Sequence, residues 1–308
     1  MQSTITDTIL LVRPKQFGYN SETAKNNSFQ SDDGATEYDR IKDEAIKEFD
    51  NMVAELRRYD IDVIVVEDTD DPVKYDAVFP NNWITTHSNG HIVTFPMFAA
   101  SRRSERREDI VDLLTNKFGY TKRYGFEYLE SEEQYLEGTG SMIIDRVNRI
   151  IYACLSPRTN VMTLEKFAVL ENCRKVIFHS YDSNNELIYH TNVMMAMGEQ
   201  IVVVCLDAIK DPEERQLLVY SFERTGKVIV EISISQMEQF AGNMMQVKSK
   251  LGEKYLLMSR AAYNSLSVQQ IDKIQQFSKI ISIPIPTIEK YGGGSVRCMV
   301  AEIFKPIS

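Results

Sequence analysis

The chain has 308 residues, of which 43% are hydrophobic and 26% charged, as in an ordinary soluble protein able to bury a core without disulfide or metal staples. Its net charge of -9 argues against a nucleic acid or an anionic membrane as partner, because both bind basic surfaces. The basic cluster at 102–107 is interleaved with acidic residues, so we expect a solvated helix face there.

No apolar run is long enough to cross a membrane, and Ile9–Val12 is too short for the core of a signal peptide. The four cysteines lack the spacing of metal ligands, and three of them, Cys154, Cys173 and Cys205, lie in or beside apolar segments. These features predict a reduced, cytoplasmic protein, and we expect neither a metal nor an organic cofactor.

The predicted elements recur in a fixed order of strand, turn, strand, helix and strand. In the first unit, strands at Ile84–His87 and Ile92–Phe95 surround a Ser-Asn-Gly turn. A helix with Ser104 as its N-cap then ends at Gly119, and a short strand is expected near Tyr120.

The same order of elements returns in three further units. We expect their two strands, helix and last strand at 141–144, 149–153, 163–173 and 175–178; at 193–197, 201–204, 211–226 and 228–231; and at 244–247, 255–258, 267–277 and 280–283. A fifth unit is split between the chain ends, where 296–304 is expected to pair with 9–13 and a helix at 39–59 leads to a strand at 62–66.

The units start about 50 to 57 residues apart, a spacing typical of radial or stacked repeats. Five such units, closed by joining the two ends, predict a five-bladed α/β propeller formed by residues 1–308 as a single domain. A generic α/β sandwich in which the spacing is accidental is the alternative.

A glycine-rich segment near the C-terminus is the first candidate for chemistry. Gly292–Gly294 belong where the backbone approaches something closely or adopts positive φ. Cys298 follows the glycines at the start of an apolar strand, which is a suitable position for a nucleophile. A glycine hairpin before a buried structural cysteine fits this segment equally well. Cys154 and Cys205 lie inside apolar runs, and we expect them in the core.

A nucleophilic thiol needs a proton acceptor, and the chain has four histidines. His190 lies at the start of the first strand of the third unit, the same relative position that Cys298 has in the fifth unit. In a propeller these starting points, the unit entries, converge around the axis. His87 and His91 flank a turn and are expected at the surface, and His179 is expected to be structural. His190 is therefore the candidate partner of Cys298.

Two further unit entries add polar groups. In the second unit, Glu137 stands before Gly138 and Gly140, and its carboxylate could hold a substrate N–H or orient His190. The first unit begins with the segment 79–83, Phe-Pro-Asn-Asn-Trp, which includes the chain's one tryptophan. An amide, a carboxylate, a histidine and a cysteine together suit attack by a thiolate on a planar, nitrogen-rich carbon.

These segments resemble the motifs of the guanidine-modifying enzymes, the pentein superfamily of arginine deiminases, dimethylarginine hydrolases and amidinotransferases. The resemblance implies a five-bladed propeller, with Cys298 as nucleophile, His190 as acid and base, and Glu137 as the group that orients and holds. The segment 79–83 resembles the one whose carboxylate grips the guanidinium, which implies substrate contacts for Phe79, Asn82 and Trp83.

This chain departs from the arginine-acting members at two positions, where it has Asn82 and Asn192 in place of aspartate. An unpaired buried carboxylate is costly, whereas an amide is tolerated when hydrogen-bonded and can donate to a carbonyl oxygen. The two amides therefore favour a neutral ureido group, as in citrulline, and the pattern is most similar to the branch described as citrulline-utilisation hydrolases. Succinylarginine dihydrolases, which begin with a guanidinium, also have asparagine near the first position.

The expected reaction is a hydrolysis through a covalent intermediate on Cys298. Its thiolate attacks the ureido carbon, and His190 protonates the departing amine and then activates water, so that citrulline gives ornithine, ammonia and carbon dioxide. Arginine deiminase, dimethylarginine hydrolase and amidinotransferase activities are the alternatives. A non-catalytic pentein binding protein is a further one, against which the joint presence of Cys298, His190 and Glu137 argues.

The remaining expectations concern the substrate and the chain's own assembly. The long polar segment 17–30 is either a lid over the site or an ordered surface loop. We expect Arg13 or Arg297 near the carboxylate of a small amino-acid substrate. A homodimer is compatible with the sequence, which does not indicate the oligomeric state.

Overall fold

The computed structural model describes residues 3–31 and 37–307, and within these ranges the strands form five three-stranded sheets. In each sheet the first strand is antiparallel to the second, and the third is parallel to the second. The sheets are β3 (Ile84–Thr86), β4 (His91–Thr94) and β5 (Lys122–Gly125); β6 (Ile143–Asp145), β7 (Ile150–Cys154) and β8 (Arg174–Phe178); β9 (Met195–Met197), β10 (Ile201–Val204) and β11 (Val228–Glu231); β12 (Met245–Lys248), β13 (Lys254–Ser259) and β14 (Lys279–Ile283); and β15 (Ala301–Glu302), β1 (Thr8–Arg13) and β2 (Asp62–Glu67).

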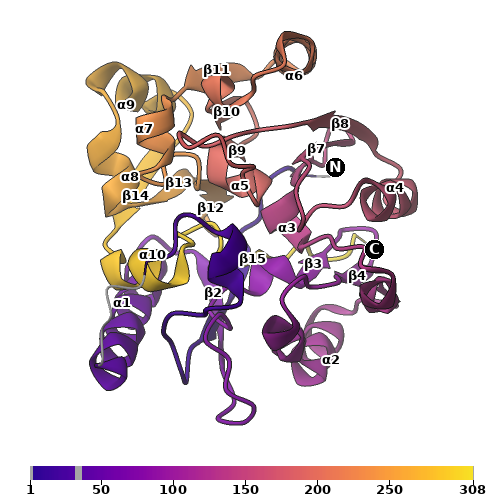
Figure 1. Ribbon diagram of the computed structural model, residues 1–308, viewed down its shortest axis with the longest axis vertical. Helices are drawn as coiled ribbons and strands as arrows, with labels where there is room; N and C mark the ends of the chain where they lie inside the picture. The colour runs from indigo at the N-terminus through magenta and orange to yellow at the C-terminus, as the bar shows by residue number, and fades with distance from the viewer. Residues whose placement is uncertain (1–2, 32–36, 308) are drawn as a thin grey trace.

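The five sheets are arranged as blades around one centre, with the long helices α1, α2, α4 and α6 toward the outside and the short helices α3 and α5 nearer the centre (Figure 1). The outer helices join the second and third strands of the blades: α1 (Tyr38–Arg58), α2 (Glu108–Phe118), α4 (Val161–Leu170), α6 (Pro212–Arg224) and α9 (Val268–Gln275). The inner ones are η2 (Pro80–Asn82), α3 (Gly138–Ser141), α5 (Thr191–Met194) and α10 (Pro286–Gly292).

The fifth blade is built from both ends of the chain. Ile9 and Leu10 of β1 pair antiparallel with Glu302 and Ala301 of β15, and β1 runs parallel to β2. The predicted pairing of the two ends and the five-bladed α/β propeller are therefore confirmed.

The outer helices form where the sequence has apolar stripes and caps. In α1, buried residues recur every three or four positions from Ile41 to Leu56, which places them on one face. The side chain of Asp211 accepts hydrogen bonds from two backbone N–H groups of α6, and Ser267 makes a capping box at the start of α9. Gly119 ends α2 with φ of 76°, as predicted.

Three local predictions were wrong. Ser104 lies in a 3-10 helix, η3 (Ala100–Glu105), and α2 begins at Glu108 with Arg107 as its N-cap. The first strand of the third unit starts only at Met195, because the residues before it form the helical turn α5. His87 is buried, since its ring contacts Thr85 and, across the blade boundary, Arg146 and Glu171.

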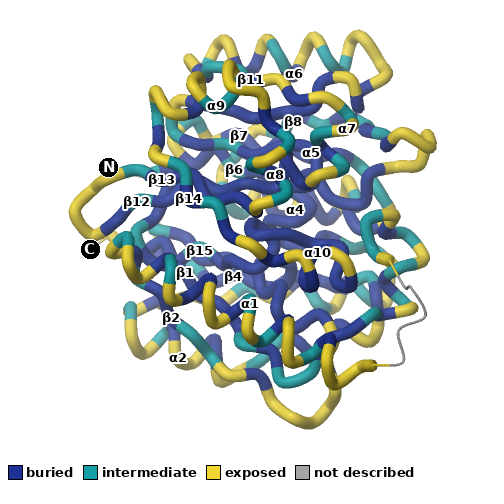
Figure 2. The backbone as a smooth tube through the Cα atoms, turned by 90° about the vertical axis from the view of Figure 1, so that its left-hand side faces the viewer, coloured by how far each residue is buried: buried dark blue, intermediate teal, exposed yellow. Residues whose placement is uncertain are grey.

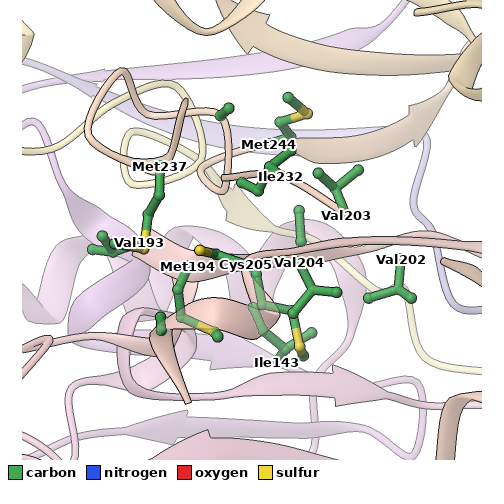
Figure 3. Close-up of a cluster of buried hydrophobic side chains, with 14 of the residues drawn as sticks. Ile143, Val193, Met194, Val202, Val203, Val204, Cys205, Ile232, Met237 and Met244 are labelled. Atoms are coloured by element: carbon green, nitrogen blue, oxygen red, sulfur yellow. The ribbon is translucent and has the colours of Figure 1, made fainter. Parts of the chain in front are cut away.

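The core lies between neighbouring blades and between the sheets and the outer helices, and the exposed backbone lies mostly on the outer helices and loops (Figure 2). β10 is buried along its whole length, which explains its unbroken Ile-Val-Val-Val sequence. Its valines pack among Ile143 of β6 and the methionines Met194, Met237 and Met244 (Figure 3). Cys154 and Cys205 are fully buried in this cluster, as predicted.

A buried ion pair joins the second and third blades away from the inner helices. Lys227 Nζ lies 3.0 Å from Asp145 Oδ2 and also donates to the carbonyl oxygens of Gly198 and Glu199. The side chains of both ions are at most 1% exposed, so each depends on the other for compensation of its charge. None of the helices in the described ranges combines the length and the apolar character that a membrane span needs.

Glu289 in α10 is a buried carboxylate whose charge opposes folding. It accepts a hydrogen bond from Ser295 Oγ at 2.6 Å and is 7% exposed. Burial raises its pKa from 4.5 to about 7, against the opposing effect of Ser259 and Ser295, and the nearby Glu48 raises it further.

We predict that Glu289→Gln removes a pH dependence of stability. The folded chain holds the proton of Glu289 up to about pH 7 and the unfolded chain releases it near 4.5, so this contribution is full below 4.5 and is lost as pH rises through 7. The free energy of unfolding of the variant, taken relative to that of wild type, should therefore be higher at pH 8 than at pH 5 by on the order of 1–3 kcal/mol. Thermal melting at the two pH values measures this. An equal difference at both, as expected for the exposed Glu231→Gln, would contradict it.

Candidate active site

The turns that precede the first strands of the first, third and fifth blades meet at one small pocket. Its lining comes from blade entries, from the loops around them and from the N-terminal segment: Thr23, Asn27, Asp76, Phe79, Asn82, Arg102, Arg158, Tyr189, His190, Gly292, Gly293, Gly294 and Cys298. The structure therefore brings Cys298 and His190 to the same pocket, from different blades.

His190 and Glu137 form a buried pair. Glu137 lies in the turn before the first strand of the second blade, and His190 lies in the corresponding turn of the third blade. His190 Nε2 lies 2.8 Å from Glu137 Oε2, and Glu137 Oε1 accepts the backbone N–H of Phe98 at 2.9 Å. Gly140 makes room for the ring, because a Cβ there would lie only 2.7 Å from His190 Nδ1. The pair fixes the orientation of the imidazole.

The protonation states of this pair follow from burial and from two arginines. Burial raises the pKa of Glu137, but Arg158, His190 and Arg102 outweigh it and bring the value to about 2. Burial lowers the pKa of His190, more than Glu137 raises it, and Arg158 and Arg102 lower it further. At neutral pH the imidazole is therefore neutral beside an ionised carboxylate.

Cys298 lies in the turn just before β15, and not within the strand. Its backbone N–H donates to Ser295 O at 2.9 Å, and the residue is 3% exposed. Two amide nitrogens face the sulfur: Asn192 Nδ2 at 3.4 Å and Asn243 Nδ2 at 3.3 Å. Gly294 packs against Cys298, which the run of glycines allows.

Asn82 lines the pocket, whereas Asn192 is fully buried behind the lining, in contact with Cys298. Asn82 Oδ1 accepts a hydrogen bond from Arg102 Nη1 at 2.8 Å, and its Nδ2 donates to Asn81 Oδ1 at 3.0 Å. Asn192 Oδ1 is buried and has no hydrogen-bond partner within the described part of the chain.

Arg102 corrects the prediction of a solvated basic face, because its side chain is 3% exposed and lines the pocket. The tight turn of η3 directs it inward, where Nε and Nη2 bind the two carboxylate oxygens of Glu105, both at 2.8 Å. Burial raises the pKa of Glu105 to about 7 against the opposing effect of Arg102. A sequence pattern of alternating charges does not distinguish this buried pair from a solvated face.

Arg158 is a second buried cation that sequence reasoning missed. It lies 3.5 Å from Glu137 Oε2 and stacks on the ring of Tyr189 at 4.9 Å. It also donates to Asn26 Oδ1 and to Thr23 O of the N-terminal segment. The one available signal was its place in a polar loop directly after the buried strand β7.

The N-terminal segment 17–30 packs over the pocket, held by Arg158 and by a second set of contacts. Asn20 Nδ2 donates to Asp76 Oδ2 at 2.7 Å, and Asn27 Nδ2 donates to Gly293 O at 3.3 Å. Thr23 and Asn27 line the pocket directly. The segment is therefore part of the site and not a separate surface loop.

Four predicted binding residues do not line the pocket in the described part of the chain, and Asn192, described above, is one of them. Trp83 is buried in a neighbouring core cluster with Ile84. Arg13 points to the outer helix, where it pairs with Asp50 and Glu67, and Arg297 turns away from Cys298 to pair with Glu302 at 2.7 Å. Phe79, by contrast, contributes to the lining, as predicted. Residues 3–31 and 37–307 include no group of His, Cys, Asp and Glu side chains placed to hold a metal ion.

Solved structures with the same fold as this chain include hydrolases of arginine and of dimethylarginine. The N-terminal domain of ArgZ bound to substrate, from an arginine dihydrolase of the ornithine-ammonia cycle in cyanobacteria, is 17% identical with a TM-score of 0.71, and the match covers 98% of this chain and 99% of that one. Unliganded AgrE is 16% identical with a TM-score of 0.72, and the chain spans 40% of its length. A dimethylarginine dimethylaminohydrolase in an adduct with S-methyl-L-thiocitrulline is 14% identical, with a TM-score of 0.64 and coverage of 97% and 100%.

The family assignment rests on sequence. No curated protein matches this chain. The family model described as "N,N dimethylarginine dimethylhydrolase, eukaryotic" matches residues 13–305, which is nearly the whole chain. The predicted pentein superfamily is thereby confirmed: the chain belongs to the N,N dimethylarginine dimethylhydrolase family and is a pentein hydrolase of carbon–nitrogen bonds.

Proposed function

We propose that the protein hydrolyses the ureido group of citrulline to ornithine, ammonia and carbon dioxide, with Cys298 as nucleophile, His190 as acid and base, and Glu137 as the residue that orients His190. The observation that carries the proposal is a pair of amides near the nucleophile and the base, Asn82 in the pocket lining and Asn192 buried beside Cys298. Asn192 contacts the sulfur, and Asn82 lies beside His190 across Gly140. A ureido group offers both a carbonyl oxygen and N–H groups, and asparagine can pair with either.

The charges around the pocket support a neutral reacting group. Among the described residues that line it, Arg102 and Arg158 are cations and Asp76 is the one carboxylate. Arg102 donates to Asn82 and Arg158 lies 3.5 Å from Glu137, so both cations lie close to the groups assigned to the reacting end of the substrate, in a way that Arg13 and Arg297 do not. A guanidinium bound there would lie near two cations, with Asp76 as the one carboxylate among the described lining residues and with Glu137 already paired to His190.

The steps follow from the protonation states. Glu137 accepts the Nε2–H of neutral His190, so Nδ1 is the basic nitrogen and takes the proton of the Cys298 thiol. The thiolate attacks the ureido carbon, and the same proton passes to the departing ornithine amine, which leaves a carbamoyl thioester. His190 then accepts a proton from water, the hydroxide releases carbamate, and carbamate decays to ammonia and carbon dioxide.

Arginine or a methylarginine is the second candidate substrate. The family name and the names of the similar structures favour it, and Asp76 gives the pocket one carboxylate that could face a guanidinium.

A cytoplasmic location is also part of the proposal. The four cysteines are free, as expected in a reducing compartment, and this supports it.

An assay of ornithine and ammonia with citrulline, arginine and dimethylarginine tests the proposed substrate, with Cys298→Ala as the blank. Ornithine from citrulline at a higher kcat/KM than any product from the other two supports the proposal. Turnover of arginine or dimethylarginine with none of citrulline would overturn it and make the second candidate correct.

We predict that Cys298→Ser lowers kcat by at least about a thousandfold, because a serine hydroxyl is far less acidic than a thiol and gives up its proton to a neutral imidazole much less readily. Circular dichroism and melting temperature should stay near those of wild type. The matched control is Cys173→Ser, which changes a partly exposed cysteine outside the pocket and should retain turnover. Normal turnover by Cys298→Ser would contradict the nucleophile assignment.

We predict that Asn82→Asp shifts the preference of the site toward a cation. The new carboxylate faces Arg102 and can no longer donate, so kcat/KM for citrulline should fall about tenfold or more, while the ratio for arginine over citrulline rises. Steady-state kinetics with both substrates measures this. Asn184→Asp, at an exposed turn, is the control for added charge. An unchanged ratio in Asn82→Asp would show that this amide does not set charge preference.

A further inference from the structure

Asn243 occupies the entry of the fourth blade, between α7 (Ile234–Met237) and β12, and is 1% exposed. The fourth entry lies very close to the third. A Cβ at Gly242 would overlap the carbonyl oxygen of Val193 and lie 2.8 Å from the carbonyl carbon of Met194, both in α5. Glycine at this position therefore lets the side chain of Asn243 reach the sulfur of Cys298.

The amide of Asn243 bridges three entries with its two polar atoms. Nδ2 donates to Asn192 O at 2.9 Å and lies 3.3 Å from Cys298 Sγ, and Oδ1 accepts the backbone N–H of Arg297 at 3.0 Å. A backbone N–H can only donate and a carbonyl can only accept. These two partners fix which end of the amide faces the sulfur, so Cys298 faces an N–H and not an oxygen.

We propose that Asn243 is a further catalytic residue, which with Asn192 donates N–H groups to Cys298 Sγ and stabilises its thiolate form. Hydrogen bonds to an ionised acceptor are roughly twice as strong as those to a neutral one, so donors at the sulfur favour the thiolate over the thiol. The inference rests on the proposed function in one respect. A neutral ureido substrate brings no positive charge to the nucleophile, so the protein itself has to supply this stabilisation.

Other charged or titratable groups also surround the sulfur, and the test must leave them in place. Those at the pocket are Asp76, Arg102, Arg158, Tyr189 and His190, with Glu137 behind His190. Two variants of Asn243 change none of them. Asn243→Leu has a similar volume and no donor, and Asn243→Asp keeps an oxygen for the Arg297 N–H but places an anionic oxygen at the sulfur.

The experiment measures the rate at which iodoacetamide alkylates Cys298 as a function of pH, read from the mass of the Cys298 peptide so that the other three cysteines do not contribute. We expect the profile of both variants to move to higher pH, and further in Asn243→Asp. Each unit of displacement lowers the thiolate fraction at neutral pH about tenfold. For citrulline, kcat should fall more than KM rises, and higher pH should restore part of kcat in Asn243→Leu.

Asn82→Asp is the matched control, because it adds the same charge to the same pocket but not at the sulfur, and its alkylation profile should move less. A profile unchanged in both folded Asn243 variants would overturn the proposal, even if turnover fell, because a purely structural role predicts that result. If Asn243→Leu does not fold, Asn243→Asp carries the test. The alkylation readout needs no substrate, so failure of citrulline hydrolysis and failure of this inference are separate results.

Discussion

The pairing between the two ends of the chain is the constraint on which the site depends. β15 follows Cys298 closely, and its contact with Ile9 and Leu10 of β1 holds the fifth blade in the ring. Because the ring is closed, the turn that carries Cys298 faces the same pocket as the turn that carries His190. An open stack of the same units would leave these two residues on separate blades with no common cavity.

The closed ring also forces several charges out of water, and their arrangement sets the chemistry. Burying an ion costs several kcal/mol unless a partner compensates it. Around this pocket Arg102 is paired with Glu105, and Arg158 and His190 lie against Glu137. The result is a neutral imidazole beside an ionised carboxylate, which is the state that the proposed proton transfer from Cys298 needs. Asparagines at the remaining entries add hydrogen-bonding groups without adding charge.

Local sequence patterns predicted the blades well, because the repeats contain residues that start and end helices, such as the N-cap Asp211 and the C-cap Gly119. They also predicted Cys298, His190 and Glu137 at one site, since equivalent entries of a propeller must converge. Arg102, Arg158 and Asn243 were not predicted. The inward turn of η3, the contact with the N-terminal segment and the close approach at Gly242 are tertiary effects, and no local pattern encodes them. Arg13 and Arg297 were assigned to the substrate because charge alone does not reveal which way a side chain points.

The most direct test of the account is the identity of the covalent intermediate. The protein is mixed with citrulline, quenched in acid within the first turnover, and the mass of the Cys298 peptide is measured. We predict a carbamoyl group on Cys298, which appears and decays at rates consistent with kcat. Turnover of citrulline with Cys298 unmodified at every time, or with the adduct on another residue, would contradict it.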